Sequence, residues 1–161
     1  MPDMTRFGHL FYAEAPEAAL GDVGEYRQTG RLVRLLPAAA AAFGRLREAA
    51  ARDGMALVPI SGFRTHAYQE SLFLKAVAKY GSEAAAARWV APAGCSEHHT
   101  GLALDIGAES RPEADVESVF EETPESGWLR RRAPDFGFEL SFPRDNPQGI
   151  AYEPWHWRFI G

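Results

Sequence analysis

Apolar residues recur at helical spacing in two long stretches of the chain. The first stretch begins at Pro37, a residue type that suits the first position of a helix, and carries Phe43 and Leu46 on one face. The second stretch follows Thr65, a favourable N-cap, and stops at Gly81, a favourable C-terminal cap. The same signals predict two shorter helices, over residues 82–90 and 124–133.

An alternating pattern, typical of strands, dominates the second half of the chain. Leu102, Leu104 and Ile106 alternate with smaller or polar residues. Asp105 is therefore expected to point away from the apolar face, into open space. Further strands are predicted over residues 55–60, 136–142 and 155–160. The acidic segment 108–123 is expected to form a solvated helix or a lid.

Helices come first in this prediction and strands gather late, without a regular strand–helix–strand rhythm. That order predicts an α+β fold, with helices packed on one side of a small, mostly antiparallel sheet. The chain has 161 residues and shows neither an internal repeat nor a convincing linker, so we expect a single domain over residues 1–161.

Composition and charge exclude several classes of protein. A formal net charge of -5 without a basic patch argues against nucleic-acid binding, and no apolar run is long enough to span a membrane. Cys95 is the one cysteine, which excludes an internal disulfide and a four-cysteine zinc site; we expect a small buried thiol there. The sequence as given begins without a signal peptide, so we leave localisation open between cytoplasm, release by lysis, and the cell envelope if a leader was removed.

The candidate chemistry gathers around His98 and Asp105, which bracket a tight turn at Gly101. A histidine and an aspartate placed in this way are suitable ligands for a divalent metal, and His156 is the third candidate. Two imidazole nitrogens and one carboxylate oxygen leave one position of a tetrahedral zinc site open, as in catalytic sites. Glu153, held extended by the proline that follows it, can then accept a proton from a metal-activated water.

Each of these residues also has an ordinary structural interpretation. Asp105 can close a strand at the surface, His98 can be a satisfied loop histidine, and His156 can pack between two tryptophans. Only their occurrence together with Glu153 favours a metal site. His99 is expected to lie outside the ligand set, because adjacent residues of an extended chain point in opposite directions.

Three sequence blocks occur in order along the chain. They are Ser61-Gly62-Phe63-Arg64-Thr65 with Gln69, the Ser-x-His-x-x-Gly-x-Ala-x-Asp pattern from Ser96 to Asp105, and Glu-Pro-Trp-His from Glu153 to His156. With these blocks the chain resembles the zinc D,D-carboxypeptidases of the vancomycin-resistance type and the related L,D-carboxypeptidases that trim peptidoglycan stems. The second and third blocks are highly specific in combination.

The resemblance implies a zinc-dependent carboxypeptidase with one zinc ion per chain, in a cleft on the sheet. The zinc ligands that it implies are His98, Asp105 and His156. It implies that Glu153 is the catalytic base and that Arg64 steadies the substrate and the developing oxyanion. Gln69 and Ser96 match positions that hold the terminal carboxylate or nearby substrate groups. The implied partner is a peptidoglycan stem peptide, or another peptide that ends in D-alanine.

Two departures from the family pattern and several alternatives stay open. Phe63 stands where tyrosine is common and His99 where a small polar residue is frequent, so both are expected to alter the pocket wall and the choice of substrate. The cleaved bond can be D,D or L,D, and a D,D-dipeptidase or a phage-type endopeptidase is an alternative. A zinc-binding module without activity is another, although Glu153 and Arg64 argue against it. The last alternative is a structural domain whose motifs are coincidental.

Overall fold

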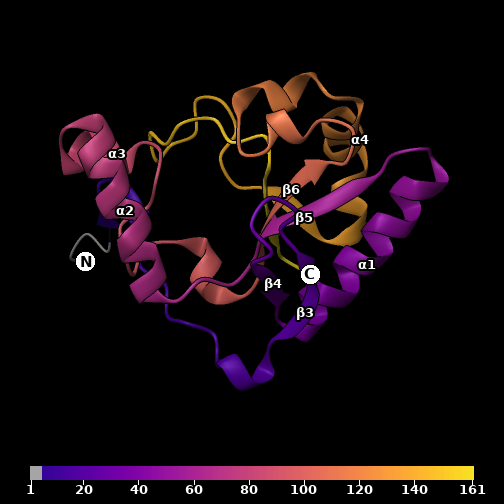
Figure 1. Ribbon diagram of the computed structural model, residues 1–161, viewed down its shortest axis with the longest axis horizontal. Helices are drawn as coiled ribbons and strands as arrows, with labels where there is room; N and C mark the ends of the chain where they lie inside the picture. The colour runs from indigo at the N-terminus through magenta and orange to yellow at the C-terminus, as the bar shows by residue number, and fades with distance from the viewer. Residues whose placement is uncertain (1–4) are drawn as a thin grey trace.

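The computed structural model describes residues 5–161 (Figure 1); residues 1–4, which belong to the start of the sequence where no signal peptide is expected, lie outside the described residues. The strands of the main sheet are β5 (Leu57–Ser61), β6 (Ala103–Ala108), β7 (Phe138–Leu140) and β8 (His156–Phe159). They are antiparallel throughout, in the order β5-β6-β8-β7. Two short hairpins precede this sheet, β1 (Thr5–Arg6) with β2 (His9–Leu10) and β3 (Gly21–Glu25) with β4 (Leu32–Leu35).

The α-helices of the described residues are α1 (Pro37–Arg52), α2 (His66–Tyr80), α3 (Glu83–Ala87) and α4 (Pro124–Arg132). The predicted start and end of α2 are confirmed. Thr65 Oγ1 accepts a hydrogen bond from the Tyr68 N–H at 3.0 Å, and Gly81 ends the helix with a φ of 91°. In residues 5–161, no helix combines the length and the apolar character needed to cross a membrane.

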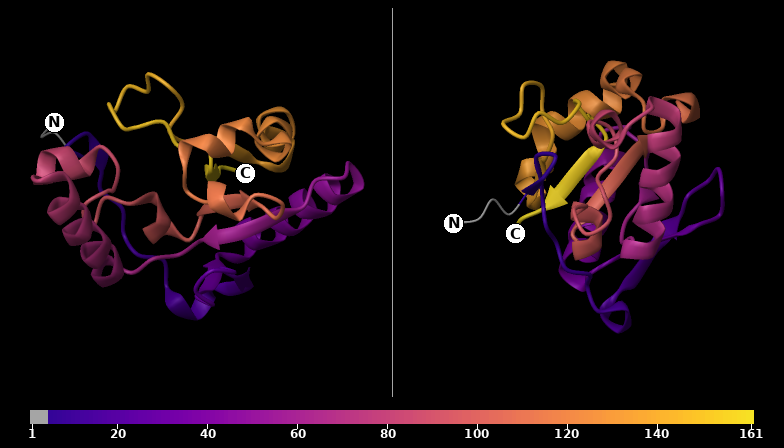
Figure 2. Two further views of the ribbon diagram at one scale, coloured as in Figure 1. Left: turned by 45° about the horizontal axis from the view of Figure 1, so that its top comes forward. Right: turned by 90° about the vertical axis from the view of Figure 1, so that its left-hand side faces the viewer.

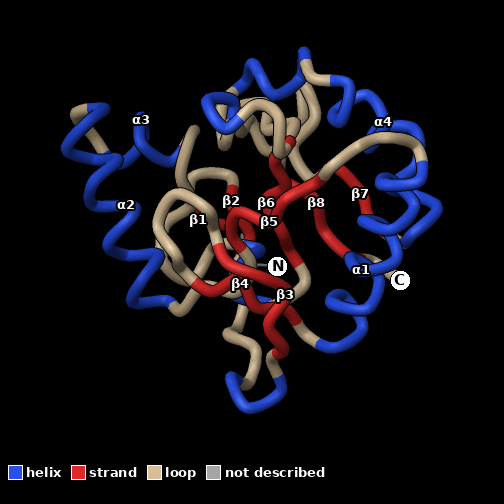
Figure 3. Tube along the Cα trace, turned by 45° about the vertical axis from the view of Figure 1, so that its right-hand side comes forward, coloured by secondary structure: helices blue, strands red, loops and turns tan. Residues whose placement is uncertain are grey.

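The helices lie on two sides of the sheet. Figures 1 and 3 show α1 and α4 on one side and the pair α2 and α3 on the other. The main core fills the space between the sheet, α1 and α4, and includes Phe43, Leu46, Leu104 and Ile106. The predicted α+β class with a small antiparallel sheet is confirmed. The expectation that the helices pack on one side of the sheet holds for α1 and α4 but not for α2 and α3, which lie on the other side. The opposite face of the sheet, toward α2, carries polar residues.

Two predictions about strands were wrong. Strands do not gather late, because β1 to β4 all precede α1. β3 has the sequence Gly-Asp-Val-Gly-Glu and is mostly exposed, so no apolar alternation marks it. The second error concerns β6, which is buried at all six positions: the main core covers the face of Leu104 and Ile106, and the pocket lies on the face of Asp105. Asp105 points away from the apolar core, as predicted, but it lies buried in the wall of a pocket and not in open space.

The acidic segment 108–123 does not form the solvated helix that was one of its two predictions. Its role as a lid stays a prediction, and Val116 of this segment lines the pocket. The segment contains two 3₁₀ turns, η3 (Pro112–Ala114) and η4 (Ser118–Glu122). Ala114 and Phe120 are fully buried in the main core, so the segment is anchored by these two side chains. The many acidic residues of the segment indicated solvent exposure, so the sequence did not predict that two of its side chains are buried in the core.

The chain that follows β5 passes so close to β4 that only glycine fits at position 62. A Cβ at Gly62 would lie 2.4 Å from the carbonyl oxygen of Arg34, which also accepts a hydrogen bond from the Phe63 N–H at 2.8 Å. We expect Gly62→Ala to lower the free energy of unfolding by about 1–3 kcal/mol, because the added methyl group meets backbone. Urea denaturation measures this loss.

Gly44 provides a matched control in the middle of α1. A Cβ at Gly44 would meet no atom within 4 Å. Gly44→Ala should therefore raise the free energy of unfolding by about 0.5–1 kcal/mol, because alanine loses less conformational entropy in a helix. A Gly62→Ala protein as stable as the wild type would contradict the packing argument.

Candidate metal centre and active site

The ladder between β6 and β8 brings Asp105 and His156 together. The two residues are direct partners across the antiparallel pair, so their side chains lie next to each other on one face. Figure 2 shows the yellow strand β8 beside the orange strand β6. His98 comes from the 3₁₀ turn η2 (Glu97–Thr100), which ends at Gly101 with a φ of 70°. Gly101 therefore makes the turn that the sequence predicted between a ligand histidine and the strand.

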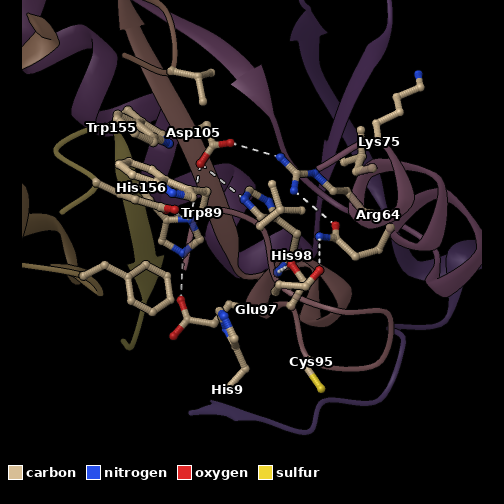
Figure 4. Close-up of a pocket in the computed structure, with 18 residues that line it drawn as sticks. His9, Arg64, Lys75, Trp89, Cys95, Glu97, His98, Asp105, Trp155 and His156 are labelled. Atoms are coloured by element: carbon tan, nitrogen blue, oxygen red, sulfur yellow. Dashed lines mark hydrogen bonds and ion pairs between the residues drawn. The ribbon is translucent and has the colours of Figure 1, made fainter. Parts of the chain in front are cut away.

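His98, Asp105 and His156 form one buried cluster (Figure 4). Asp105 Oδ1 lies 3.2 Å from His98 Nε2 and 3.3 Å from His156 Nδ1, and one ligand atom from each residue lies within 4.8 Å of the others. A tetrahedral zinc ion with bonds of about 2.0–2.1 Å keeps its ligand atoms about 3.4 Å apart, which matches these spacings. Asp105 Oδ1 is also buried without a hydrogen-bond partner among the described residues, and a cation would satisfy it. The cluster therefore fits a divalent metal ion.

Hydrogen bonds on the far side of each imidazole ring determine which nitrogen faces the cluster. His98 Nδ1 lies 2.8 Å from the carbonyl oxygen of Gly62, which leaves Nε2 for a metal. His156 Nε2 lies 2.8 Å from Glu97 Oε2, which leaves Nδ1 for a metal. Such partners fix the tautomer and the orientation of histidine ligands in metal sites.

The charges in the cluster are strongly coupled. Burial alone would raise the pKa of Asp105, but His98, His156 and Arg64 lower it well below its usual range. Burial and the Arg64 charge lower the pKa of His98 to about 4, so its ring is neutral at neutral pH. Burial would also lower the pKa of His156, but Asp105 and Glu97 raise it to about 10. A metal ion that binds His156 Nδ1 therefore displaces a proton.

Glu153 lies beside the ligand group without belonging to it. Its Oε2 is 3.6 Å from His156 Nδ1, and its backbone N–H donates to the Phe142 carbonyl oxygen at 3.0 Å. Burial raises the pKa of the Glu153 carboxyl to about 7, although the charge of His156 opposes the shift. A general base works best when its pKa lies near the operating pH, so this environment suits proton transfer.

Arg64 is held in the same pocket by three contacts. Its Nε donates to Ser61 Oγ at 2.9 Å and its Nη1 to Gln69 Oε1 at 3.2 Å. Its Nη2 lies 3.2 Å from Asp105 Oδ2, the oxygen that does not face the histidines. A guanidinium has five N–H donors, so two remain without a partner in the described part of the chain. Arg64 thus orients Asp105 and keeps donors for a bound molecule.

Gln69 and Ser96, the predicted substrate-binding residues, both line the pocket and are both buried. Gln69 uses both ends of its amide: Oε1 accepts from Arg64, and Nε2 donates to the Ala91 carbonyl oxygen at 2.8 Å. Ser96 Oγ accepts the His98 N–H at 3.2 Å and caps η2. Their contact with substrate stays a prediction, and their hydrogen bonds in the structure support Arg64 and His98.

The other residues considered from the sequence take structural positions. Cys95 is buried and lines the cavity but lies outside the ligand group, and burial raises the pKa of its thiol, as expected for an inert cysteine. His99 also lies outside the ligand group, and its Nδ1 contacts the Arg64 carbonyl oxygen at 2.8 Å. Neither Phe63 nor His99 lines the pocket, so the expectation that they alter its wall was wrong. The Phe63 ring contacts Arg34, and the His99 ring contacts His66.

The cluster opens into a cavity of about 290 Å³. Sequence reasoning missed much of its wall, including Leu72, Lys75, Trp89, Val116 and Phe142. It also missed Glu97, which is buried and whose pKa, despite the opposing effect of burial, is lowered to about 2 by His156, Ser141 and Arg158. The one available signal was the position of Glu97 directly before His98 in the second block.

Residues 33–161 match the VanY family, described as D-alanyl-D-alanine carboxypeptidase. YodJ of Bacillus subtilis (strain 168) is 36% identical over 126 residues, which are 76% of this chain and 45% of YodJ. A D-alanyl-D-alanine carboxypeptidase of Enterococcus faecalis is 35% identical over 124 residues, which are 71% of this chain and 44% of that protein. The chain spans less than half the length of these two relatives.

Solved structures share the fold over nearly the whole chain. LdcB, an LD-carboxypeptidase, superimposes with a TM-score of 0.80 at 30% identity and covers 93% of this chain and 70% of its own. VanYB in complex with D-alanine-D-alanine gives 0.72 at 31% identity, covering 93% and 79%. A vancomycin-resistance D,D-pentapeptidase VanY in complex with Zn(II) gives 0.72 at 29% identity, covering 97% and 89%. On the match over residues 33–161 and these identities, the chain belongs to the VanY family of D-alanyl-D-alanine carboxypeptidases.

Proposed function

We propose that this protein is a zinc-dependent carboxypeptidase that removes D-alanine from the end of peptidoglycan stem peptides. The observation that carries the proposal is the convergence of His98, Asp105 and His156, with Glu153 beside them, at the base of one cavity. Relatives named as D-alanyl-D-alanine carboxypeptidase and structures that contain Zn(II) or D-alanine-D-alanine support the same choice of metal and substrate.

Zinc, when bound by the three ligands, supplies a Lewis acid that lowers the pKa of a water molecule to about 7 and polarises a carbonyl group. The Glu153 carboxylate accepts the proton of the attacking water and then delivers it to the amine of the departing D-alanine. The peptide C–N bond breaks, and the water oxygen becomes part of the new carboxylate. Burial of Glu153 suits both transfers, because its pKa of about 7 lets it hold or release a proton.

Arg64 provides the electrostatic part of this mechanism. Arg64 lines the cavity and keeps two unengaged N–H donors, which can bind either the terminal carboxylate or the oxyanion of the transition state. An exopeptidase requires a group that recognises a free carboxylate, and a planar guanidinium does so with two parallel hydrogen bonds. Gln69 and Ser61 hold the guanidinium in place for that task.

Release of D-alanine from defined peptides tests the proposal. We expect release from a stem pentapeptide, a stem tetrapeptide, or both, loss of release with a chelator, and recovery with zinc. The pentapeptide reports a D,D bond and the tetrapeptide an L,D bond, while free D-alanyl-D-alanine reports a dipeptidase. Protein that carries one equivalent of zinc and releases D-alanine from none of the three would contradict the proposal. Release of internal fragments alone would favour an endopeptidase.

A further inference from the structure

Glu97 lies directly below the metal cluster, although it is not one of the three ligands. Its side chain is 7% exposed, and its carboxylate is enclosed by residues from β8 and from the loop after β7. Figure 4 shows it beneath His156, on the side away from Asp105. A buried carboxylate is costly unless charged or polar partners compensate it, so its presence here calls for a specific role.

The principal contact of Glu97 is with His156. Glu97 Oε2 accepts a hydrogen bond from His156 Nε2 at 2.8 Å. Because that nitrogen carries the proton, the lone pair of a neutral His156 ring belongs to Nδ1, which lies 3.3 Å from Asp105 Oδ1. Without an acceptor at the position of Glu97, the ring would lose the contact that selects this tautomer and this orientation.

The carboxylate of Glu97 is itself held in place from two sides. Ser141 Oγ donates to Oε2 at 2.6 Å, and Arg158 Nη1 lies 3.4 Å from Oε1. Arg158 also pairs with Glu139 on β7. Both oxygens of Glu97 are therefore engaged, and the carboxylate cannot rotate away from His156 without breaking these contacts.

His98 is oriented by a different device, a hydrogen bond to the backbone carbonyl of Gly62. Of the two ligand histidines, only His156 depends on a side chain that substitution can alter. We propose that Glu97 is a positioning residue, which holds His156 in the tautomer and orientation that bind the zinc ion. The inference rests on the proposed function, since it acts through the same metal site.

Two conservative variants separate the effect of the position of the Glu97 carboxylate from the effect of its charge. Glu97→Asp keeps the charge but shortens the side chain, so the carboxylate no longer reaches His156 Nε2. Glu97→Gln keeps the reach and an acceptor oxygen but removes the charge. We expect Glu97→Asp to weaken zinc affinity by about 10–100-fold, the range typical of lost outer partners of metal ligands, and Glu97→Gln to weaken it less. Competition with a chromophoric chelator measures both dissociation constants.

Glu139→Gln is the matched control, because Glu139 shares Arg158 with Glu97 but does not contact His156. Its zinc affinity should stay within about threefold of the wild type, well short of the loss typical of an outer partner. The His156 Nε2 proton gives a second readout in the zinc-loaded protein. Its NMR resonance should exchange slowly with water in the wild type and in Glu97→Gln, and rapidly in Glu97→Asp.

Several outcomes would overturn the inference. Glu97→Asp and Glu97→Gln that both bind zinc within about threefold of the wild type would show that position 97 does not act on the metal site. A greater loss in Glu97→Gln than in Glu97→Asp would assign the effect to charge, and an equal loss in Glu139→Gln would assign it to the whole ion-pair network. Wild-type protein that binds no zinc would instead overturn the proposed function, and this inference with it.

Discussion

Glu153→Gln is expected to lower the turnover number for D-alanine release by about 10²–10⁴-fold, the range that a positioned general base supplies. Zinc content should stay at the wild-type value, because Glu153 lies beside the ligand group and outside it, with Oε2 3.6 Å from His156 Nδ1. Glutamine preserves the shape of the side chain but cannot accept the proton of the attacking water. Amino-acid release gives the rate, and elemental analysis gives the zinc content.

The same variant should change the dependence of stability on pH in the metal-free protein. Burial raises the pKa of Glu153 from 4.5 to about 7, so between these values the unfolded chain gives up a proton that the folded protein retains. The buried carboxyl of Glu153 therefore lowers the free energy of unfolding as pH rises through this window. Below the window this loss is absent, because the carboxyl is protonated in both the folded and the unfolded state. Relative to Glu153→Gln, the wild type should lose stability from pH 4.5 to 7 in urea denaturation.

Glu125 provides the control for this substitution. It is a buried glutamate in α4, and it does not line the cavity. Glu125→Gln should leave the rate of D-alanine release unchanged, because the side chain is remote from the metal cluster. A Glu153→Gln protein with full zinc and a wild-type rate would remove Glu153 from the role of base.

The parts of the molecule that the sequence predicted are those fixed by local chemistry. Thr65 and Gly81 define the ends of α2 through a side-chain hydrogen bond and a left-handed φ, and both effects act within a few residues. The candidate ligands were also accessible, because Gly101 places His98 and Asp105 on either side of one turn. Asp105 and His156 lie on two strands that were both predicted, and the pairing of these strands is enough to bring the two side chains together.

The parts that the sequence did not predict depend on contacts between distant segments. The contacts of Glu97 with Ser141 and Arg158 span 44 and 61 positions, so no local pattern indicates that this carboxylate is buried. β6 is buried on both faces because the main core covers one face and the residues around the pocket cover the other, and the alternation along one strand does not reveal which segments pack on its faces. The same reason explains the misplaced Phe63, which does not line the pocket and contacts Arg34 on β4 through its ring and its backbone N–H.

Asp105→Asn should remove the metal site while preserving the shape of the side chain. Asp105 contributes the one carboxylate of the ligand group, and its Oδ1 is the atom close to both histidines. Asparagine offers only a neutral oxygen in its place. Zinc affinity should therefore fall by more than about 10–100-fold, the range typical of losing a group that hydrogen-bonds a metal ligand. The rate of D-alanine release should fall with it to the level of the chelated wild type.

The metal-free Asp105→Asn protein should also be less stable. Asp105 Oδ2 pairs with Arg64 at 3.2 Å, and both side chains are largely buried. Loss of the carboxylate leaves the Arg64 guanidinium and the protonated His156 without their shared counter-ion. Breaking a buried pair in this way costs about 3–5 kcal/mol. Urea denaturation of the metal-free protein measures the cost separately from zinc binding.

Asp115→Asn is the matched control, because Asp115 is an equally buried carboxylate that pairs with Arg27 at 2.9 Å away from the cluster. It should lower the free energy of unfolding and leave zinc affinity within about threefold of the wild type, because no metal ligand loses a partner. The comparison separates the loss of a buried ion pair from the loss of a metal ligand. Asp105→Asn with wild-type zinc affinity would show that the metal lies elsewhere, whatever happened to stability.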